Sequence, residues 1–164
     1  MFVYFFLYLT FSYLLDCGFS GQSQTVIASE FYNSVTSPNY PLDYGNGLEC
    51  KLLINVDSSL SLHGYILKVI FSDFQLGSCT GFGDTLKFYD GINAVSSLLG
   101  SYCGTTHPDV IFSTGQYLYV KFYTGSFTTN KGFNFSFSAV KEGMFSYSLF
   151  TTAVLFLKTF RMSL

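Results

Sequence analysis

The sequence predicts an all-β domain, an antiparallel sandwich or barrel, and three observations support this fold class. Aromatic residues make up 20% of the 164 residues, with 20 Phe, 13 Tyr and no Trp, and such side chains are enriched in strands. Fifteen glycines suit the turns that connect short strands. No segment before residue 144 shows a sustained helical period with caps, so we expect helix to be a minor component.

Six segments read as strands because they alternate or run apolar between turn signals. Turn pairs such as Asp90-Gly91 and Thr114-Gly115 separate them. Many short strands at this spacing, in one domain without an internal repeat, favour an antiparallel sandwich or barrel. In chain order the segments are Cys50–Val56, Tyr65–Phe71, Leu86–Tyr89, Val110–Phe112, Tyr117–Tyr123 and Phe133–Val140.

The N-terminal residues 1–20 are predicted to be a signal peptide. Phe2–Leu15 is an uncharged run of fourteen residues, the length of a signal-peptide apolar region and short for a membrane span. Cleavage after Ser20 fits the small-residue rule and would discard Cys17, whereas a cut near Asp16 would retain that cysteine but break the rule. The competing interpretation of this segment is a buried N-terminal strand.

The C-terminal residues 143–164 form an apolar tail. Its uncharged run, Met144–Leu157, is short for a transmembrane helix, and extension to Phe160 brings it to seventeen residues, the lower limit. Basic residues near the end of the run would then lie in the cytoplasm. A membrane tether is one interpretation, and a lipid-anchor signal or a plain apolar tail are the others. The globular domain is therefore predicted to span residues 21–142.

The charge pattern excludes several classes of partner. Charged residues are 11% of the chain, against about 25% in an average soluble protein, and the net charge is −2. Phosphate binding needs clustered Lys and Arg, so we expect no nucleic-acid partner. An anionic membrane surface is excluded on the same ground, which leaves the C-terminal tail as the one route to a membrane.

Four cysteines behind a predicted secretory signal indicate disulfides. They are Cys17, Cys50, Cys79 and Cys103. Zinc binding is disfavoured because the chain has no CxxC pair and its two histidines stand apart. Four cysteines allow three pairings, and a sequential pairing would close two loops of moderate length, each worth ~2–4 kcal/mol.

A series of motifs runs through about residues 17–140. The first is Ser37–Pro41, which reads SPNYP and precedes Tyr44 and Cys50. The later motifs, in order, are Phe71-x-x-Phe74 before Cys79, DTLKFYDG at Asp84–Gly91, GSYCG at Gly100–Gly104, Pro108-x-x-Ile-x-Ser, Leu118–Phe122 and Gly132-Phe133. Together and in this order, the motifs resemble the CUB domain family. The departures from the family pattern are Leu52, where the family often has Trp, and the long spacing between Cys17 and SPNYP.

The resemblance implies a fold and a disulfide pattern. The fold is an antiparallel jelly-roll β-sandwich of about ten strands, and the disulfides are the sequential pairs Cys17–Cys50 and Cys79–Cys103. If the signal peptide is cut after Ser20, Cys50 is left without its partner.

The resemblance also implies a function, because CUB-like domains are extracellular interaction modules. The chain shows no Walker loop and no GxSxG or HExxH motif, so we expect neither catalytic residues nor a cofactor. His63 and His107 are expected to be exposed loop residues. The favoured interpretation is a secreted or membrane-tethered module that binds an extracellular or cell-surface protein. The alternatives are a glycan-binding single-CUB protein and a fragment of a larger CUB-containing protease or receptor.

One segment supplies candidate binding residues. In Tyr117–Tyr123 the alternation places three apolar side chains on one face and Tyr117, Tyr119, Lys121 and Tyr123 on the other. Tyrosine is favoured at interfaces because its ring is apolar and its hydroxyl stays hydrated. The competing interpretation is that these tyrosines pack under a loop or beside a neighbouring strand.

Two further residues are singled out by motif. Asn134-Phe135-Ser136 is the one N-glycosylation sequon, and if the alternating Phe side chains face the core, Asn134 faces water. The resemblance also implies a calcium site of three acidic residues, of which Asp84 matches one while Gly77 and Gly125 stand at the other two. Asp84 is thus the only residual calcium ligand, and we expect it to be a turn residue instead of a metal ligand.

Overall fold

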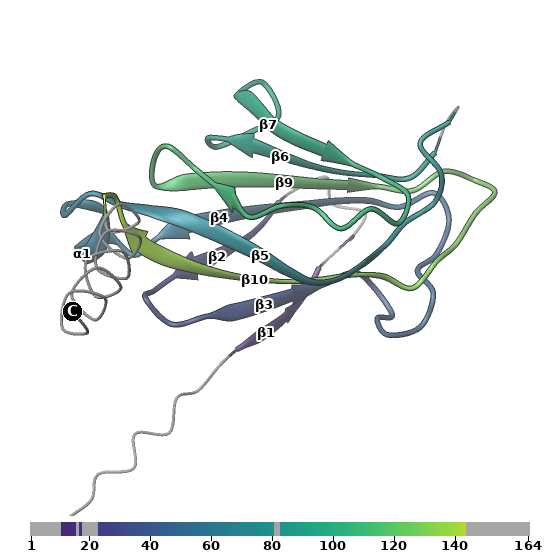
Figure 1. Ribbon diagram of the computed structural model, residues 1–164, viewed down its shortest axis with the longest axis horizontal. Coiled ribbons are helices and arrows are strands. Elements are labelled where there is room, and N and C mark those ends of the chain that lie inside the picture. The colour runs from purple at the N-terminus through teal and green to yellow at the C-terminus, as the bar shows by residue number, and fades with distance from the viewer. Residues whose placement is uncertain (1–10, 16, 18–22, 81–82, 144–164) are drawn as a thin grey trace, which may run out of the picture.

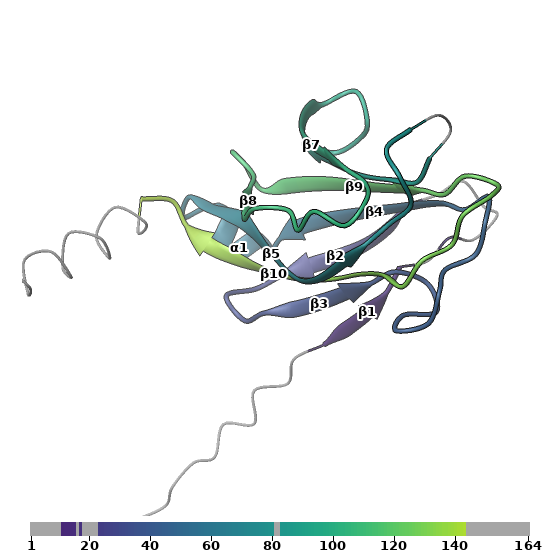
Figure 2. The same cartoon turned by 45° about the vertical axis from the view of Figure 1, so that its right-hand side comes forward.

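The computed structural model describes residues 11–15, 17, 23–80 and 83–143. In this part of the chain ten strands form two five-stranded sheets that pack face to face as a sandwich (Figure 1). The same described residues contain one short helix, α1 (Ser58–Ser61), which lies at one end of the sandwich (Figure 2). The predicted all-β sandwich is confirmed.

Each sheet combines long central strands with short edge strands. Two strand pairs, β1 with β3 and β2 with β4, are parallel, and the remaining pairs are antiparallel. The order in sheet A is β1 (Ser12–Leu14), β3 (Asn33–Thr36), β10 (Gly132–Lys141), β5 (Tyr65–Gln75) and β8 (Ile111–Phe112). The order in sheet B is β2 (Gln24–Ala28), β4 (Glu49–Val56), β9 (Tyr117–Tyr123), β6 (Thr85–Asp90) and β7 (Ser97–Tyr102).

Strand β1 comes from the segment that the sequence analysis assigns to the signal peptide. Its residues pair in parallel with β3, Leu15 directly after it is buried, and Cys17 forms a disulfide. The part of the predicted signal peptide before Phe11 lies outside the described residues, and so does the tail from residue 144. Cleavage after Ser20 and membrane tethering stay predictions, and the described ranges contain no helix with the length and hydropathy of a membrane span.

Aromatic side chains fill the space between the sheets. Phe133, Phe135 and Phe137 on β10 are all fully buried, as the alternation of that strand requires. The ring of Phe133 meets Phe122 of sheet B edge-on, with centroids 5.2 Å apart, and Phe135 meets Phe88 at 5.6 Å. Such edge-to-face pairs stabilise the core beyond the area they bury.

A β-bulge explains why β5 buries two residues of opposite parity. Phe71 and Phe74 are both buried although strict alternation would place them on opposite faces. Phe71 pairs with Phe135 and Asp73 pairs with Asn134, so Ser72 is the extra residue on β5. The bulge turns Phe74 back into the core, where its ring packs edge-on against Phe71.

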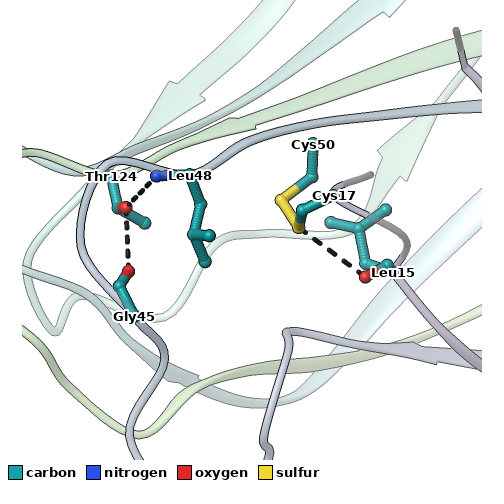
Figure 3. Close-up of a disulfide and its surroundings, with 6 residues drawn as sticks. All are labelled: Leu15, Cys17, Gly45, Leu48, Cys50 and Thr124. Carbon is teal, nitrogen blue, oxygen red and sulfur yellow. Dashed lines mark hydrogen bonds between the residues drawn. A yellow bond between two sulfur atoms is a disulfide. The ribbon is translucent and has the colours of Figure 1, made fainter. Parts of the chain in front are cut away.

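Both predicted disulfides are present. One connects the two sheets, and the other connects the segment before β6 to the segment after β7. Cys17 follows β1 of sheet A, and Cys50 lies on β4 of sheet B, so this bond joins the two sheets (Figure 3). Beside it, Thr124 accepts a hydrogen bond from the Leu48 amide at 2.8 Å and donates one to the Gly45 carbonyl at 2.9 Å (Figure 3). Cys79 precedes β6, and Cys103 follows β7.

Replacing Cys79 and Cys103 together by alanine is expected to lower the free energy of unfolding by about 2–4 kcal/mol, because their disulfide closes a 24-residue separation and restricts the unfolded chain. Urea unfolding of the full chain, followed by tyrosine fluorescence, measures the change. Ser101→Ala, an exposed substitution on β7, is the control. Equal unfolding midpoints for the double variant and the control would contradict this prediction.

Candidate binding face

The candidate binding face is the solvent-facing side of the three central strands of sheet B. Strands β4, β9 and β6 bury every second side chain in the core, which leaves the intervening side chains pointing outward. We call this surface the outer face of sheet B, and we define it by Glu49, Lys51 and Leu53 on β4, Tyr117, Tyr119, Lys121 and Tyr123 on β9, and Thr85, Lys87 and Tyr89 on β6.

Three lysines lie side by side across this face. Lys121 on β9 is in register with Lys51 on β4 and with Lys87 on β6, and we call the three residues the lysine row. Residues directly opposite each other on antiparallel strands have Cα atoms about 4.5–5.5 Å apart. Of these three lysines, only Lys121 is predicted from the sequence, because the alternation of one strand carries no information about which residues lie opposite.

A single carboxylate neutralises one side of the lysine row. Glu49 contacts Lys121 at 3.0 Å and Lys51 at 3.2 Å, both through its Oε1 atom. Hydrogen bonds from Lys121, which has the larger effect, and from Lys51 hold the pKa of the Glu49 carboxyl below its ordinary value. Among the described residues, Lys87 has no ion-pair partner.

The tyrosines predicted to bind differ in exposure. Tyr123 is 39% exposed, and Tyr117 is half-buried. Tyr119 is only 7% exposed, because Leu53 and Tyr89 flank it on the neighbouring strands, and the Tyr89 ring lies 6.2 Å away. For Tyr119, packing beside a neighbouring strand is therefore the observed role, and Tyr117, Lys121 and Tyr123 remain the accessible candidates.

A small hollow opens between β9 and β6. Its volume is about 160 Å³, and it is lined by Thr85, Lys87, Tyr89, Lys121 and Tyr123. Two lysines and two tyrosines therefore border one space on the outer face. A space of this size and lining suits a single anionic group.

Asp84 is the centre of a buried hydrogen-bond network outside this face. Its carboxylate accepts from the Tyr44 hydroxyl at 2.5 Å and from the Gly125 amide at 2.7 Å. The Gly77 amide and the Thr128 hydroxyl also donate to it, at 3.1 and 3.4 Å. Burial, together with this hydrogen bond to Asp84, raises the pKa of the Tyr44 phenol well above its ordinary value. Asp84 therefore connects three loops.

The residues at Asp84 do not fit a calcium ion. Calcium takes six to eight oxygens, but both Asp84 oxygens already accept hydrogen bonds, and Gly77 and Gly125 have no side chain. A Cβ atom at position 77 would overlap the Asp84 carboxylate and the Thr128 hydroxyl. Within the described ranges, no group of three His, Cys, Asp or Glu side chains could hold a metal.

The other predicted residues lie apart from the outer face. Asn134 is half-buried on β10, in the middle of sheet A, between partners on β3 and β5, and its glycosylation stays a prediction. His63 and His107 are exposed and lie in loops. Their Nδ1 atoms lie near backbone carbonyl oxygens of Ser59 and Pro108, at 2.7 and 3.2 Å.

Comparison with known proteins identifies similar domains. A family model described as the CUB domain matches residues 23–137. The chain is 31% identical to Tolloid-like protein 2 of Mus musculus over 112 residues, which cover 66% of this chain and 10% of that protein. It is 32% identical to cubilin of Canis lupus familiaris over 102 residues, which cover 60% of this chain and 3% of that protein. The chain thus spans a tenth or less of these curated relatives.

Comparison with solved structures identifies the same fold. The full extracellular region of zebrafish Gpr126/Adgrg6 superposes on this chain with a TM-score of 0.59 at 29% identity, over 73% of this chain and 15% of that one.

Tyr44→Phe is expected to lower the free energy of unfolding by about 1–3 kcal/mol, because it removes a hydrogen bond to a buried carboxylate. Since the pKa of Tyr44 is raised in the folded state, its contribution is present below the ordinary tyrosine pKa of about 10 and is lost above it. The difference between the two proteins should therefore narrow above that pH. Tyr40→Phe, which removes a more exposed bond to Asp73, is the control in urea titrations and should cost less. A pH-independent difference would contradict the assignment.

Calcium is not expected to stabilise the domain, because the ligands around Asp84 are missing. A dissociation constant of about 10 μM would add about 3 kcal/mol at 2 mM calcium. Thermal unfolding of the full chain in 2 mM calcium, in 2 mM magnesium and in EDTA should give equal midpoints. Stabilisation by calcium alone, or a micromolar constant in isothermal titration, would show that this expectation is wrong.

Proposed function

The chain belongs to the CUB domain family, and from this premise we propose that it is a non-catalytic, extracellular protein-interaction module. CUB domains in general bind other extracellular proteins, and the family match covers residues 23–137. The matched proteins include one whose solved structure is described as a full extracellular region. Two disulfides are consistent with a domain that works outside the cytosol.

We assign the binding surface to the outer face of sheet B. The observation that carries this assignment is the combination of an exposed tyrosine, Tyr123, with neighbouring lysines around one hollow. Tyrosine contributes strongly to interfaces because it buries a large ring at a low cost in conformational entropy. The partner is then an extracellular or cell-surface protein, and the carbohydrate-binding interpretation is the competing one.

The length of the relatives favours a second candidate, in which this domain is one part of a longer CUB-containing protein. In that case the interaction function belongs to the domain, and any enzymatic activity belongs to other domains. The sequence of the full transcript distinguishes the two candidates. We also propose that the protein is secreted, or is tethered to a membrane through residues 143–164.

Tyr123→Ala is expected to weaken binding to a protein partner by about 5- to 30-fold, because a central interface tyrosine contributes about 1–2 kcal/mol. The full chain is screened against an array of extracellular protein domains and, in parallel, against a glycan array. Tyr32→Ala is the matched control, since Tyr32 is 43% exposed but lies next to β3 in sheet A.

Equal affinities of the Tyr123→Ala and Tyr32→Ala variants for the same partner would refute the assignment to the outer face. Binding to the glycan array alone would replace the protein-interaction function with the carbohydrate-binding one.

A further inference from the structure

The lysine row places like charges directly opposite each other. Lys121 lies between Lys51 and Lys87 on adjacent strands, and like charges opposite each other in a sheet are destabilising. The chain has only eight basic residues, so three in one row is a large share of its positive charge. An arrangement with this electrostatic cost requires counter-charge.

The structure supplies counter-charge on one side only. Glu49 sits against Lys51 and Lys121, within 3.2 Å of both ammonium groups. On the other side, between Lys121 and Lys87, there is a hollow of about 160 Å³ in place of a carboxylate. The described residues provide no acidic side chain for Lys87. An anion between Lys87 and Lys121 would reduce the repulsion in the lysine row, and the hollow at this position is large enough to hold one.

We propose that the hollow between Lys87 and Lys121 binds an acidic side chain of the partner protein, so that the partner's carboxylate completes the charge balance of the lysine row. This inference rests on the proposed function and names the chemistry of the partner. The bound Asp or Glu accepts hydrogen bonds from both ammonium groups, as Glu49 does on the other side.

The lining of the hollow favours a protein over a sulfated glycan. Tyr89 and Tyr123 border the hollow, and tyrosine is enriched in protein–protein interfaces. A sulfated glycan carries many charges and is held by many amines, whereas only two lysines line this hollow. The net charge of −2 also means that the rest of the molecule does not attract a polyanion.

The test measures binding of a fluorescein-labelled octaglutamate peptide to the full chain by anisotropy, with octaglutamine as the neutral control. Lys87→Gln should weaken octaglutamate binding by about 2- to 5-fold, the range of one exposed ion pair. Glu49→Gln should strengthen it by a similar factor, because this change removes the competing internal carboxylate. Lys141→Gln, an exposed lysine at the end of β10 in sheet A, should leave it unchanged. Raising the salt concentration from 50 to 300 mM should weaken binding to the wild type more than to the Lys87→Gln variant.

The opposite responses of the Lys87→Gln and Glu49→Gln variants are what a merely structural role would not produce, since both changes leave the buried side of the sheet intact. Equal binding of octaglutamate and octaglutamine, or equal affinities of all variants, would overturn the proposal. Binding of a heparin octasaccharide in the expected variant order, without octaglutamate binding, would also overturn it and assign the hollow to sulfated glycans. If binding of a protein partner found on the array depends on Tyr123 but not on Lys87, the assignment of the outer face is retained and the proposal of an acidic partner side chain is refuted.

Discussion

The alternate burial of side chains along β4, β9 and β6 is the constraint on which the rest of the molecule depends. Each of these strands commits one face to the aromatic core, so the opposite face must carry side chains that tolerate water. Hydrogen-bonded register then determines which outward side chains become neighbours. The lysine row follows from these two requirements. Each lysine alternates with buried residues on its own strand, and the register places the three lysines directly opposite one another across β4, β9 and β6. Core packing and strand register thus determine which surface side chains become neighbours.

The loops at the Asp84 end are held together by protein groups. A carboxylate that is fully buried is costly unless hydrogen bonds satisfy it, and Asp84 receives them from Tyr44, Gly77, Gly125 and Thr128. The absence of a side chain at Gly77 lets the backbone approach the carboxylate closely. A network of this kind organises the loops at the cost of flexibility, because its donors come from three separate loops and all converge on one buried carboxylate.

Strong alternation made most of the long strands predictable, while four other strands and the cross-strand contacts were not. The predicted segment Tyr117–Tyr123 coincides with β9, and β4, β5, β6, β8 and β10 match predicted segments to within a few residues. Strands β2, β3 and β7 were missed because they are short or poor in buried apolar residues, and β1 was missed because its apolar sequence also suits a signal peptide. In the site, the outward tyrosines were predicted, but Glu49, Lys51 and Lys87 were not, since strand register depends on residues far apart in the chain.

The position of β10 has a consequence for how the chain reaches its native state. This strand is the last one among the described residues, yet it lies in the middle of sheet A between β3 and β5. Contacts between residues as distant as Val35 and Phe135 must therefore form before the sheet is continuous. During synthesis, sheet A cannot be completed until residues up to Lys141 have emerged from the ribosome. Until then, the core-facing side of β5 remains exposed. Such high contact order predicts slow folding and a dependence on chaperones during synthesis.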